Sequence, residues 1–327
     1  MEKKVLITGA AGFIGSHLTE TLAAEGRQVR AMVHYNFQSN WGWLETLAPS
    51  LMENVEVFPA DICDPFAVRK AVEGCDTVFH LASLIAIPYS YLAPASYVET
   101  NVKGALNLLQ ACLEEGVERL VHTSTSETYG SAQYVPIDEE HPLVGQSPYS
   151  ASKIAADKLA ESFHLSFDLP VATIRPFNTF GPRQSARAVI PTIITQALTG
   201  AETIRLGALH PIRDLNFVAD TVSGFLAVAR TDAAVGTVTN IGRGEGISVG
   251  DLARLILELC GSEARIESEE ERLRPDRSEV QQLVCGNQKA RELLGWSPRY
   301  SLRQGLEMTV EWMRDNLERY KPDLYNL

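Results

Sequence analysis

The feature that most constrains the fold is a strand, a glycine-rich turn and a helix in direct succession. The apolar run 5–8 predicts a buried strand, the turn carries Gly9, Gly12 and Gly15, and a helical pattern follows over 16–24. Glycines let the backbone approach a pyrophosphate, and a helix N-terminus supplies N–H groups and positive potential. The succession therefore predicts a dinucleotide-binding unit, with the spacing G-x-x-G-x-x-G instead of G-x-G-x-x-G. A tight turn without a ligand is the plainer interpretation.

The end of the second predicted strand, 29–33, bears on the choice of cofactor. An acidic residue there would bind the ribose 2′-hydroxyl of NAD. The chain instead continues His34-Tyr35-Asn36, and no basic cluster that would hold the 2′-phosphate of NADP follows. These residues alone leave NAD and NADP both open.

Strands and helices alternate through the first half of the chain. This alternation predicts an α/β fold with a doubly wound parallel Rossmann sheet, covered by helices on both faces. Ligands bind such sheets at the carboxyl ends of the strands. The residues expected at those ends are Asp61, Ala82, Thr123 and Arg175. Further strands are expected at 55–58, 77–82, 117–122 and 171–174, and helices at 65–73, 98–115 and 150–163.

In the second half of the chain, the predicted strands and helices are separated by loop-like and charged segments. This half opens with a loop-like segment at 176–183, continues with a predicted strand at 213–218, and contains a charged loop at 267–277. A single arginine in such loops is more often a solvated surface residue, whereas several around one cleft would suit a diphosphate. The arginines concerned are Arg183, Arg187, Arg213 and Arg274. Helices are expected at 192–198, 219–230, 249–260 and 302–317.

Two short segments carry side chains suited to proton transfer. Tyr149 and Lys153 are one helical turn apart, so both can face one site, where the lysine ammonium would lower the pKa of the phenol. Thr125, Ser126 and Glu127 follow a predicted strand and would face the same cleft. With a redox cofactor, this set could move a proton and a hydride. The alternative is that Tyr149 and Lys153 are a chance helical pair and that the Ser/Thr run is simply a polar strand terminus. The glycine-rich turn upstream makes this alternative weaker.

Composition and charge exclude several classes of protein. The net charge of −12 argues against a basic nucleic-acid-binding face. The five cysteines are scattered without metal-ligand spacing, so we expect a reducing compartment and no metal site. The strand pattern starts directly after 1–4, which leaves no room for a signal peptide, and no apolar stretch reaches the ~18 residues that span a bilayer. We therefore expect a cytoplasmic protein without a membrane partner.

Taken together, the motifs resemble one family over nearly the whole chain: the extended short-chain dehydrogenases/reductases that act on nucleotide sugars. Within it, Thr125-Ser126-Glu127 resembles the 4,6-dehydratase branch, because epimerases usually carry small or hydroxyl residues in place of the glutamate. The other motifs that carry the resemblance are Gly9-x-x-Gly12-x-x-Gly15, Asp61-Ile62, His80-Leu81-Ala82, Asn101-x-x-Gly104, Tyr149-x-x-x-Lys153, Arg175-Pro176-x-Asn178-x-x-Gly181-Pro182 and Leu293-Leu294-Gly295-Trp296.

Three stretches narrow the resemblance further. The segments 40–44, 85–91 and 184–191 resemble the nucleotide-N-acetylglucosamine 4,6-dehydratases of legionaminic-acid biosynthesis. Many sugar-nucleotide dehydratases place an aspartate where Ser126 stands and use it as the acid that expels water. GDP-mannose-type dehydratases are similar to this sequence instead, with a serine before the glutamate. UDP and GDP both stay open as the nucleotide.

The resemblance implies an NAD-dependent lyase that converts GDP- or UDP-N-acetylglucosamine to its 4-keto-6-deoxy derivative. Tyr149, assisted by Lys153, would take the C4 hydroxyl proton while hydride passes to NAD. Thr125 would hydrogen-bond the C4 oxygen, and Glu127 would remove the C5 proton. Hydride would then return to C6. Ser126 has too high a pKa to expel the C6 hydroxyl unaided, so either Glu127 passes its new proton on or Ser126 relays one.

The resemblance also implies how the chain is divided and which residues contact ligands. Residues 1–177 would form an NAD-binding Rossmann domain, to which the chain returns around 214–240. Residues 178–327 would mostly form a smaller mixed α/β domain for the nucleotide sugar. The implied cofactor contacts are Gly9, Gly12, Phe13, Ile14, Gly15, Tyr35, Asn36, Asp61, Ile62, Leu81, Ala82, Thr123, Tyr149, Lys153 and Pro176. The implied substrate contacts are Pro88, Thr125, Asn178, Arg187, Val189, Arg213, Asn216 and Arg274.

Alternatives stay open for the activity and for the oligomeric state. UDP-glucuronate decarboxylase also carries Thr-Ser-Glu before Tyr-x-x-x-Lys and loses carbon dioxide after oxidising C4; a nucleotide-sugar 4-epimerase is the third candidate. A non-catalytic NAD-binding regulator would need none of the polar residues implied in catalysis. By analogy, helices 98–115 and 150–163 would pair as a four-helix bundle in a homodimer, although the same faces could simply pack on the sheet.

Overall fold

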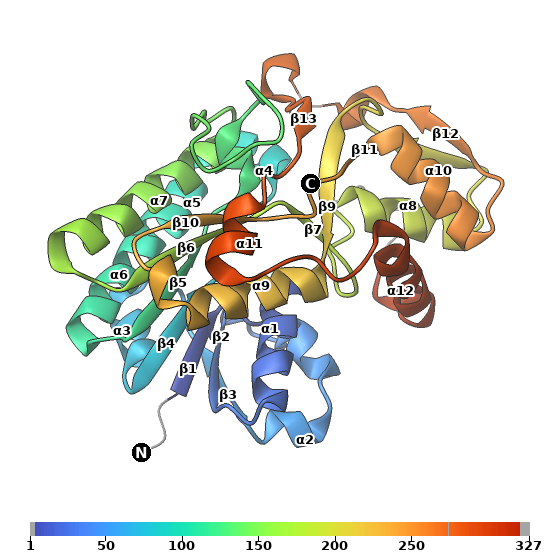
Figure 1. The fold of residues 1–327 in the computed structure, drawn as a ribbon. Helices are drawn as coiled ribbons and strands as arrows, with labels where there is room; N and C mark the ends of the chain where they lie inside the picture. Colours follow the sequence, from blue (N-terminus) through green and yellow to red (C-terminus); the bar gives the residue numbers. More distant parts are fainter. Residues whose placement is uncertain (1–3, 274, 321–327) are drawn as a thin grey trace.

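The chain is built on a seven-stranded parallel sheet, seen in a computed structural model that describes residues 4–273 and 275–320 (Figure 1). The strand order is β10-β6-β5-β4-β1-β2-β3. This order reverses direction between β1 and β4, so the crevice at their carboxyl ends is where a sheet of this kind binds ligands. The doubly wound parallel α/β sheet predicted from the sequence is confirmed.

The elements of this sheet follow the predicted alternation closely. Its strands are β1 (Lys4–Thr8), β2 (Val29–Val33), β3 (Val55–Pro59), β4 (Cys75–His80), β5 (Arg119–Thr123), β6 (Val171–Pro176) and β10 (Val238–Ile241). The helices packed around it are α1 (Phe13–Ala24), α2 (Pro49–Met52), α3 (Pro65–Val72), α6 (Gly104–Glu115), α7 (Pro148–Phe167), α9 (Val218–Arg230) and α11 (Gln288–Leu294). The strand β10 was not predicted.

The sheet is buried on both faces, and alternate strand residues serve opposite cores. In β1, Val5 and Ile7 belong to the core that includes α1 and α9, whereas Leu6 belongs to the core that includes α3 and α6. In β4, Phe79 and Val78 divide in the same way. Burial on both faces explains why these strands read as nearly continuous apolar runs.

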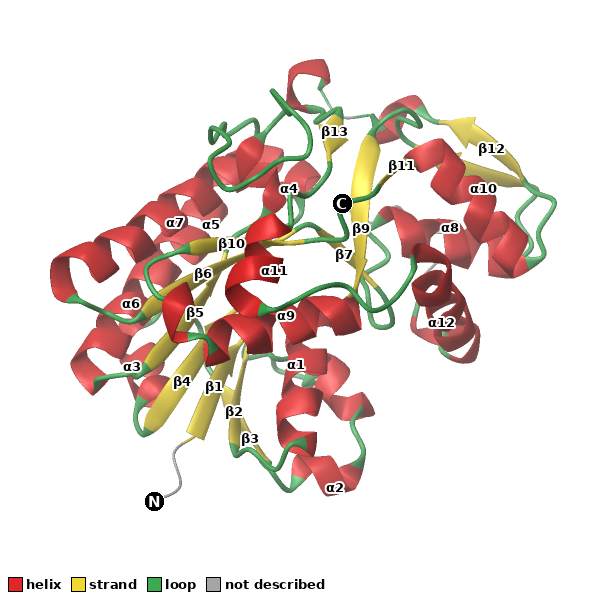
Figure 2. Cartoon of the chain, in the orientation of Figure 1, coloured by secondary structure: helices red, strands yellow, loops and turns green. Residues whose placement is uncertain are grey.

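The second half of the chain adds mixed strands and three packed helices, which lie to the right of the parallel sheet in Figure 2. A four-stranded sheet contains β7 (Asn178–Phe180), β9 (Ile212–Phe217), β11 (Gly246–Ser248) and β13 (Gln282–Leu283), and β8 (Thr203–Leu206) pairs with β12 (Arg265–Ser268). The helices are α8 (Val189–Leu198), α10 (Val249–Cys260) and α12 (Leu302–Asp315).

Two segments differ from their sequence prediction. The single helix expected at 98–115 begins as a π-helical stretch, η2 (Val98–Lys103), and α6 starts only at Gly104. The loop expected at 176–183 contains β7, which pairs with β9. A strand of three residues is too short to produce a readable alternation of apolar and polar residues.

Helix α7 is longer than predicted at both ends. Its start is fixed by a capping box, in which the Ser147 side chain accepts a hydrogen bond from the Ser150 N–H and the Ser150 hydroxyl accepts one from the Ser147 N–H. Pro148 occupies the first helical position, where the lack of an N–H costs nothing. This cap places Tyr149 in the first turn of the helix.

The remaining elements are short. They are η1 (Gly42–Thr46), α4 (Ile87–Leu92), α5 (Pro94–Tyr97), η3 (Ser126–Tyr129), η4 (Asp232–Ala234), η5 (Glu270–Arg272), η6 (Asp276–Ser278) and η7 (Leu317–Arg319). Within residues 4–273 and 275–320, no helix has the length and apolar character needed to cross a membrane.

Candidate active site

The turn between β1 and α1 is too tight for side chains at two of its glycines. Gly9 has φ +71°, and a Cβ there would lie 2.9 Å from the N atom of Ala82. A Cβ on Gly15 would lie 2.3 Å from the carbonyl oxygen of Gly9. Gly12 is the N-cap of α1, and it has no side chain that could accept hydrogen bonds from the first N–H groups of the helix. Phe13 and Ile14 are the first two residues of that helix.

The loop after β4 is held to β1 by one hydroxyl group. Thr8 Oγ1 accepts hydrogen bonds from the N–H groups of Leu81 and Ala82, both at 3.1 Å. The same oxygen lies 3.0 Å from Nδ1 of His80. The motif His80-Leu81-Ala82 therefore fixes the edge of the crevice opposite the glycine turn.

Three predicted cofactor contacts, Tyr35, Asn36 and Asp61, follow the ends of β2 and β3, and two of them already make hydrogen bonds within the protein. The Asn36 amide donates to the Asn40 carbonyl at 2.7 Å and accepts from the Asn40 N–H at 3.0 Å. Tyr35 is exposed. One carboxylate oxygen of Asp61 accepts the Cys63 N–H at 2.9 Å. Asn36 thus shapes its own loop, and its neighbour Tyr35 is the more accessible of the pair.

Tyr149 and Lys153 are both buried and face the carboxyl end of β5. Lys153 Nζ donates to the carbonyl oxygen of Thr123 at 2.6 Å. Burial lowers the pKa of Lys153 to about 8, against the opposing charge of Asp157. Burial also raises the pKa of Tyr149 above its usual range, and a hydrogen bond from Thr125 opposes this only in part. The expectation that Lys153 lowers the pKa of Tyr149 is thus wrong for this state, in which burial dominates and the ammonium points at a carbonyl.

The Thr125-Ser126-Glu127 segment is a short helical turn and not the strand end that was expected. Thr125 is the N-cap of η3, and its side chain accepts the Glu127 N–H at 3.3 Å. Ser126 is buried, whereas Glu127 is half-buried. The charge of Glu127 acts on Tyr149 and contributes to its raised pKa. The structure therefore brings Thr125, Glu127 and Tyr149 into one group.

The motif Asn101-x-x-Gly104 braces this group from the side. The Asn101 amide bonds to both the N–H and the carbonyl of Leu84, at 2.8 and 2.9 Å, and donates to Ser152 Oγ at 2.9 Å. A Cβ on Gly104 would lie 2.9 Å from Ile62, so the glycine lets α6 approach the loop after β3. Asn101 lies in the π-helical stretch, a feature frequent at functional sites.

Three of the four arginines singled out in the second half are described by the structure, and each of them has different surroundings. Arg213 pairs with Glu279 at 3.0 Å. Arg183 is buried and pairs with Glu20 at 2.7 Å, so it joins the loop before α8 to α1. Arg187 is exposed, yet its charge opposes the rise in the pKa of Tyr97 that burial causes, which places it near the group around Tyr149. Arg274 lies outside the described residues.

The segment around Ser278 links Arg213 to the predicted substrate contact Pro88. Ser278 Oγ lies 2.5 Å from the Tyr91 hydroxyl and donates to the Gln146 carbonyl at 2.8 Å. Pro88 and Tyr91 belong to the same helix, α4. Glu279, the partner of Arg213, directly follows Ser278 in the chain. Ser278 thus contacts both α4 and Gln146, the residue before the N-cap of α7.

Three predicted contact residues have buried polar atoms that lack a partner within residues 4–273 and 275–320. They are the Oγ1 of Thr123 and the Oδ1 atoms of Asn178 and Asn216. Asn178 and Asn216 lie on the paired strands β7 and β9, one residue apart in register, so their side chains face opposite sides of this sheet, and that of Asn216 donates to Thr221 of α9. Buried acceptors without partners are costly in a finished core and are expected where a ligand supplies the missing bond. Of the other predicted contacts, Pro176 is buried in β6 and Val189 opens α8.

A buried polar network beneath the site was missed by sequence reasoning. Asp157, one turn after Lys153 on α7, pairs with Arg175 at 2.9 Å and with His122 at 3.0 Å. Arg175 therefore points into the protein and not into the crevice. The signal that could have revealed the network is positional: Asp157 follows Lys153 by four residues on a helix, and His122 precedes Ser124 by two on a strand.

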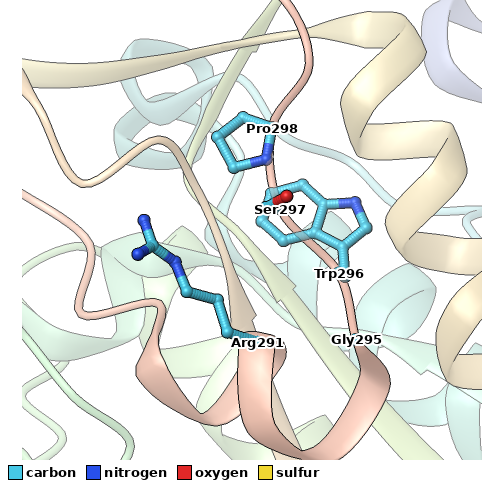
Figure 3. Close-up of a pocket in the computed structure, with 5 residues that line it drawn as sticks. All are labelled: Arg291, Gly295, Trp296, Ser297 and Pro298. Atoms are coloured by element: carbon cyan, nitrogen blue, oxygen red, sulfur yellow. The ribbon is translucent and has the colours of Figure 1, made fainter.

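A surface hollow of about 460 Å³ lies beside α11 (Figure 3). Its lining residues are Arg291, Gly295, Trp296, Ser297 and Pro298, none of which is a predicted site residue. The indole N–H of Trp296 donates to Ser223 at 2.8 Å and so anchors this segment to α9. The hollow is separate from the crevice at the carboxyl ends of β1 and β4.

Comparison with known proteins places the chain. The family model of GDP-mannose 4,6 dehydratase matches residues 6–309. A dTDP-glucose 4,6-dehydratase of Streptomyces griseus is 34% identical over 98% of this chain and 97% of its own length. The chain belongs to the nucleotide-sugar 4,6-dehydratase family of extended short-chain dehydrogenases/reductases. The resemblance to the extended short-chain dehydrogenases/reductases and to their 4,6-dehydratase branch is confirmed.

Two other similar proteins bear on the choice within the family. UDP-glucuronic acid decarboxylase 1 of Xenopus tropicalis is 31% identical over 99% of this chain and 75% of its own length. The structure of DesIV, a dTDP-glucose 4,6-dehydratase of Streptomyces venezuelae solved with NAD bound, matches with a TM-score of 0.86 and 28% identity, over 98% of this chain and 99% of that chain. Neither relative is named for an N-acetylglucosamine nucleotide.

Proposed function

We propose that this chain is an NAD-dependent nucleotide-sugar 4,6-dehydratase, and that its substrate is an NDP-N-acetylglucosamine with UDP or GDP as the nucleotide. The observation that carries the reaction is the grouping of Thr125, Glu127, Tyr149 and Lys153 at the carboxyl end of β5. The N-acetylglucosamine substrate rests on the resemblance of the segments 40–44, 85–91 and 184–191. An acid/base pair on a buried helix face suits oxidation at C4. A carboxylate beside it adds a base for elimination, which epimerisation does not need.

NAD is the cofactor, and the residues present fit it. The glycine turn of β1 and α1 leaves backbone room and helix N–H groups for the pyrophosphate. Thr123 Oγ1 is a buried hydroxyl oxygen without a partner in the part of the chain that the structure describes. The carbonyl oxygen of the same residue accepts a hydrogen bond from Lys153. When bound, NAD accepts hydride from C4 of the sugar and later delivers it to C6.

The protein residues supply the proton transfers. Tyr149 acts as a phenolate that takes the proton of the C4 hydroxyl and becomes a phenol, and the Thr125 hydroxyl that bonds it stabilises the phenolate before the transfer. Lys153, with its pKa near 8, is mostly charged at neutral pH and stabilises negative charge nearby. The C4 carbonyl then acidifies the C5 proton, which Glu127 removes.

Loss of the C6 hydroxyl and return of hydride to C6 complete the reaction. The C6 hydroxyl leaves with one proton as water, and C5 regains one proton as hydride arrives at C6. Glu127 passes the proton taken from C5 through the adjacent Ser126 hydroxyl to the leaving C6 hydroxyl. The proton that C5 regains comes from the solvent, to which Tyr149 releases the proton taken from the C4 hydroxyl. The net change is loss of one water molecule, with the cofactor returned to its starting state.

The nucleotide sugar is held by the second half of the chain. We assign its diphosphate to Arg213, and the resemblance implies Arg187 and Arg274 as further contacts. Its polar groups are assigned to the unsatisfied acceptors of Asn178 and Asn216. Pro88 and Val189 lie on the elements that border this space, α4 and α8. In this division, residues 178–327 mostly bind substrate, while α9 and β10 return to the cofactor-binding sheet.

The homodimer is part of the proposal and has its own support. Helices α6 and α7 pack side by side, and large apolar side chains project into solvent from them and from η2, which leads into α6. Val98, Leu106 and Leu165 are 54%, 39% and 74% exposed. We expect Leu106→Glu to convert a dimer to a monomer in light scattering, while Met308→Glu on α12, which is 44% exposed, leaves the dimer intact. A monomeric wild type would contradict this assignment.

The activity is tested by incubating the protein with single nucleotide sugars and no added reductant. UDP-N-acetylglucosamine, GDP-N-acetylglucosamine, dTDP-glucose and UDP-glucuronate are analysed by mass spectrometry. Loss of water from an N-acetylglucosamine nucleotide is the expected result. Loss of water from dTDP-glucose alone would keep the reaction but replace the substrate, and loss of carbon dioxide from the glucuronate would favour the decarboxylase named among the relatives.

A further inference from the structure

We propose that Asp157 is a positioning residue that holds the Thr125-Ser126-Glu127 segment against the face of α7 carrying Tyr149 and Lys153. This inference rests on the function proposed above, because it assigns Asp157 to the elimination step of that reaction. It concerns a residue that is expected to touch neither the cofactor nor the sugar.

The first support is the way one carboxylate holds β5 on both sides of Thr123. Oδ1 of Asp157 lies 3.0 Å from Nε2 of His122, and Oδ2 accepts the Ser124 hydroxyl at 2.5 Å. Thr123, between these residues, accepts Lys153 through its carbonyl oxygen. Asp157 and Lys153 on α7 therefore fix three consecutive residues of the strand that leads into the segment.

The second support is a link from Asp157 to the far end of the segment. Arg175 donates from Nη2 to Asp157 at 2.9 Å and from Nε to Ser124 at 3.0 Å. Its guanidinium carbon lies 4.6 Å from the ring centroid of Tyr129, the last residue of η3. Through Arg175, the same carboxylate thus holds both Ser124 before Glu127 and Tyr129 after it.

The charges around Asp157 keep it ionised at working pH. Burial alone would raise its pKa, but hydrogen bonds from His122 and Ser124 and the charge of Arg175 lower it to about 2. The other titratable groups nearby are Tyr149 and Lys153 on α7, His80 on β4 and Tyr129 on η3; the charge of Asp157 raises the pKa of Tyr149 and of Lys153, and the His80 ring lies 5.7 Å from that of His122. Burial lowers the pKa of both histidines, so they stay neutral and Asp157 pairs mainly with Arg175.

An ion pair this deep does not by itself imply a role in catalysis, because replacing one with apolar residues is often neutral for stability. A role of the Asp157–Arg175 pair follows from where the residues that it contacts lie. They join the helix that carries the acid Tyr149 to the turn that carries the base Glu127. A displacement of ~1 Å between such groups can cost about 100-fold in rate.

The test separates the two halves of the reaction in Asp157→Asn. The amide keeps the shape, but its NH2 group faces a donor and the network cannot close. Rapid mixing with NAD and nucleotide sugar follows C4 oxidation by the near-ultraviolet absorbance of the reduced cofactor. Exchange of the C5 proton with heavy water, read by mass spectrometry, follows the action of Glu127. Because loss of the Asp157 charge also lowers the pKa of Lys153 and of Tyr149, both steps are followed across pH. At the best pH of each protein, we expect oxidation to stay within about threefold of wild type while C5 exchange falls about 100-fold.

Two further variants keep the test sharp. Asp168→Asn makes the same chemical change at the exposed C-cap of α7, where φ of 55° suits asparagine, and should alter neither step. Ser124→Ala removes the hydroxyl shared by Asp157 and Arg175 but leaves the ion pair; it should show the same split at about tenfold and carries the test if Asp157→Asn does not fold. Equal losses in both steps, or no loss, would overturn the proposal.

Failure of the proposed function would be visible separately. Wild-type protein that neither reduces NAD nor exchanges C5 with any nucleotide sugar would refute the dehydratase assignment. Positioning is then decided by amide hydrogen exchange over 124–130. Faster exchange there in Asp157→Asn than in Asp168→Asn supports it, and equal exchange overturns it.

Discussion

At the scale of single residues, Glu127 and Tyr149 divide the proton transfers between them. Glu127→Gln removes the base for C5 but leaves Tyr149, Lys153 and Thr125 in place. We expect addition of nucleotide sugar to reduce the bound NAD while water loss falls by a factor of roughly 100 to 10,000. Absorbance and mass spectrometry measure the two outcomes. Glu140→Gln, at an exposed position in the loop before α7, is the matched control; normal turnover by Glu127→Gln would refute its assignment.

Tyr149→Phe should stop the reaction earlier. The variant loses the hydroxyl that the Thr125 side chain bonds, and keeps the ring that packs edge-on against Tyr97 at 6.2 Å between centroids. We therefore expect a folded protein in which neither reduced cofactor nor product forms, at least about 100-fold below wild type. Tyr134→Phe, at a surface tyrosine, should react normally. Cofactor reduction by Tyr149→Phe at the wild-type rate would assign the C4 proton to another group.

At the scale of elements, the cofactor turn depends on the close approach of β1 and α1. Gly15→Ala would place a methyl group 2.3 Å from the Gly9 carbonyl oxygen, and backbone has to shift to admit it. We expect a loss of about 1–3 kcal/mol in unfolding free energy and weaker binding of NAD by fluorescence titration. Gly250→Ala, where the nearest atom would be 3.5 Å away, is the control. Unchanged NAD affinity in Gly15→Ala would contradict the cofactor assignment.

Helix α1 is also joined to the loop before α8, and this contact predicts a pH dependence. His17 Nε2 lies 3.0 Å from the Pro182 carbonyl, and burial together with the Arg183 charge lowers its pKa from 6.5 to about 4. The unfolded chain binds more protons between these values, so stability is complete above pH 6.5 and falls as pH drops toward 4. Urea unfolding should show the wild type losing about 3 kcal/mol more than His17→Gln over this window. Parallel curves for the two proteins would refute the coupling.

At the scale of the whole molecule, the sequence predicts the parts that have strong local signals. The glycine turn, the paired Tyr149 and Lys153 and the alternation of elements each follow from spacing, and together they predicted the fold. The strand β10 and the short β7 were missed, because their pairing depends on a sheet built by distant residues. Asp157 with Arg175 was missed for the same reason: nothing local shows that residues 18 apart share a buried charge pair.

The central claim is that hydride leaves C4 and returns to C6 of the same sugar while water is lost. It is tested most directly with an NDP-N-acetylglucosamine deuterated at C4, incubated in ordinary water without reductant. We predict a product that has lost water and keeps the deuterium, located at C6 by fragmentation. An unchanged mass, loss of carbon dioxide from a glucuronate analogue instead, or a dehydrated product without deuterium would contradict the claim.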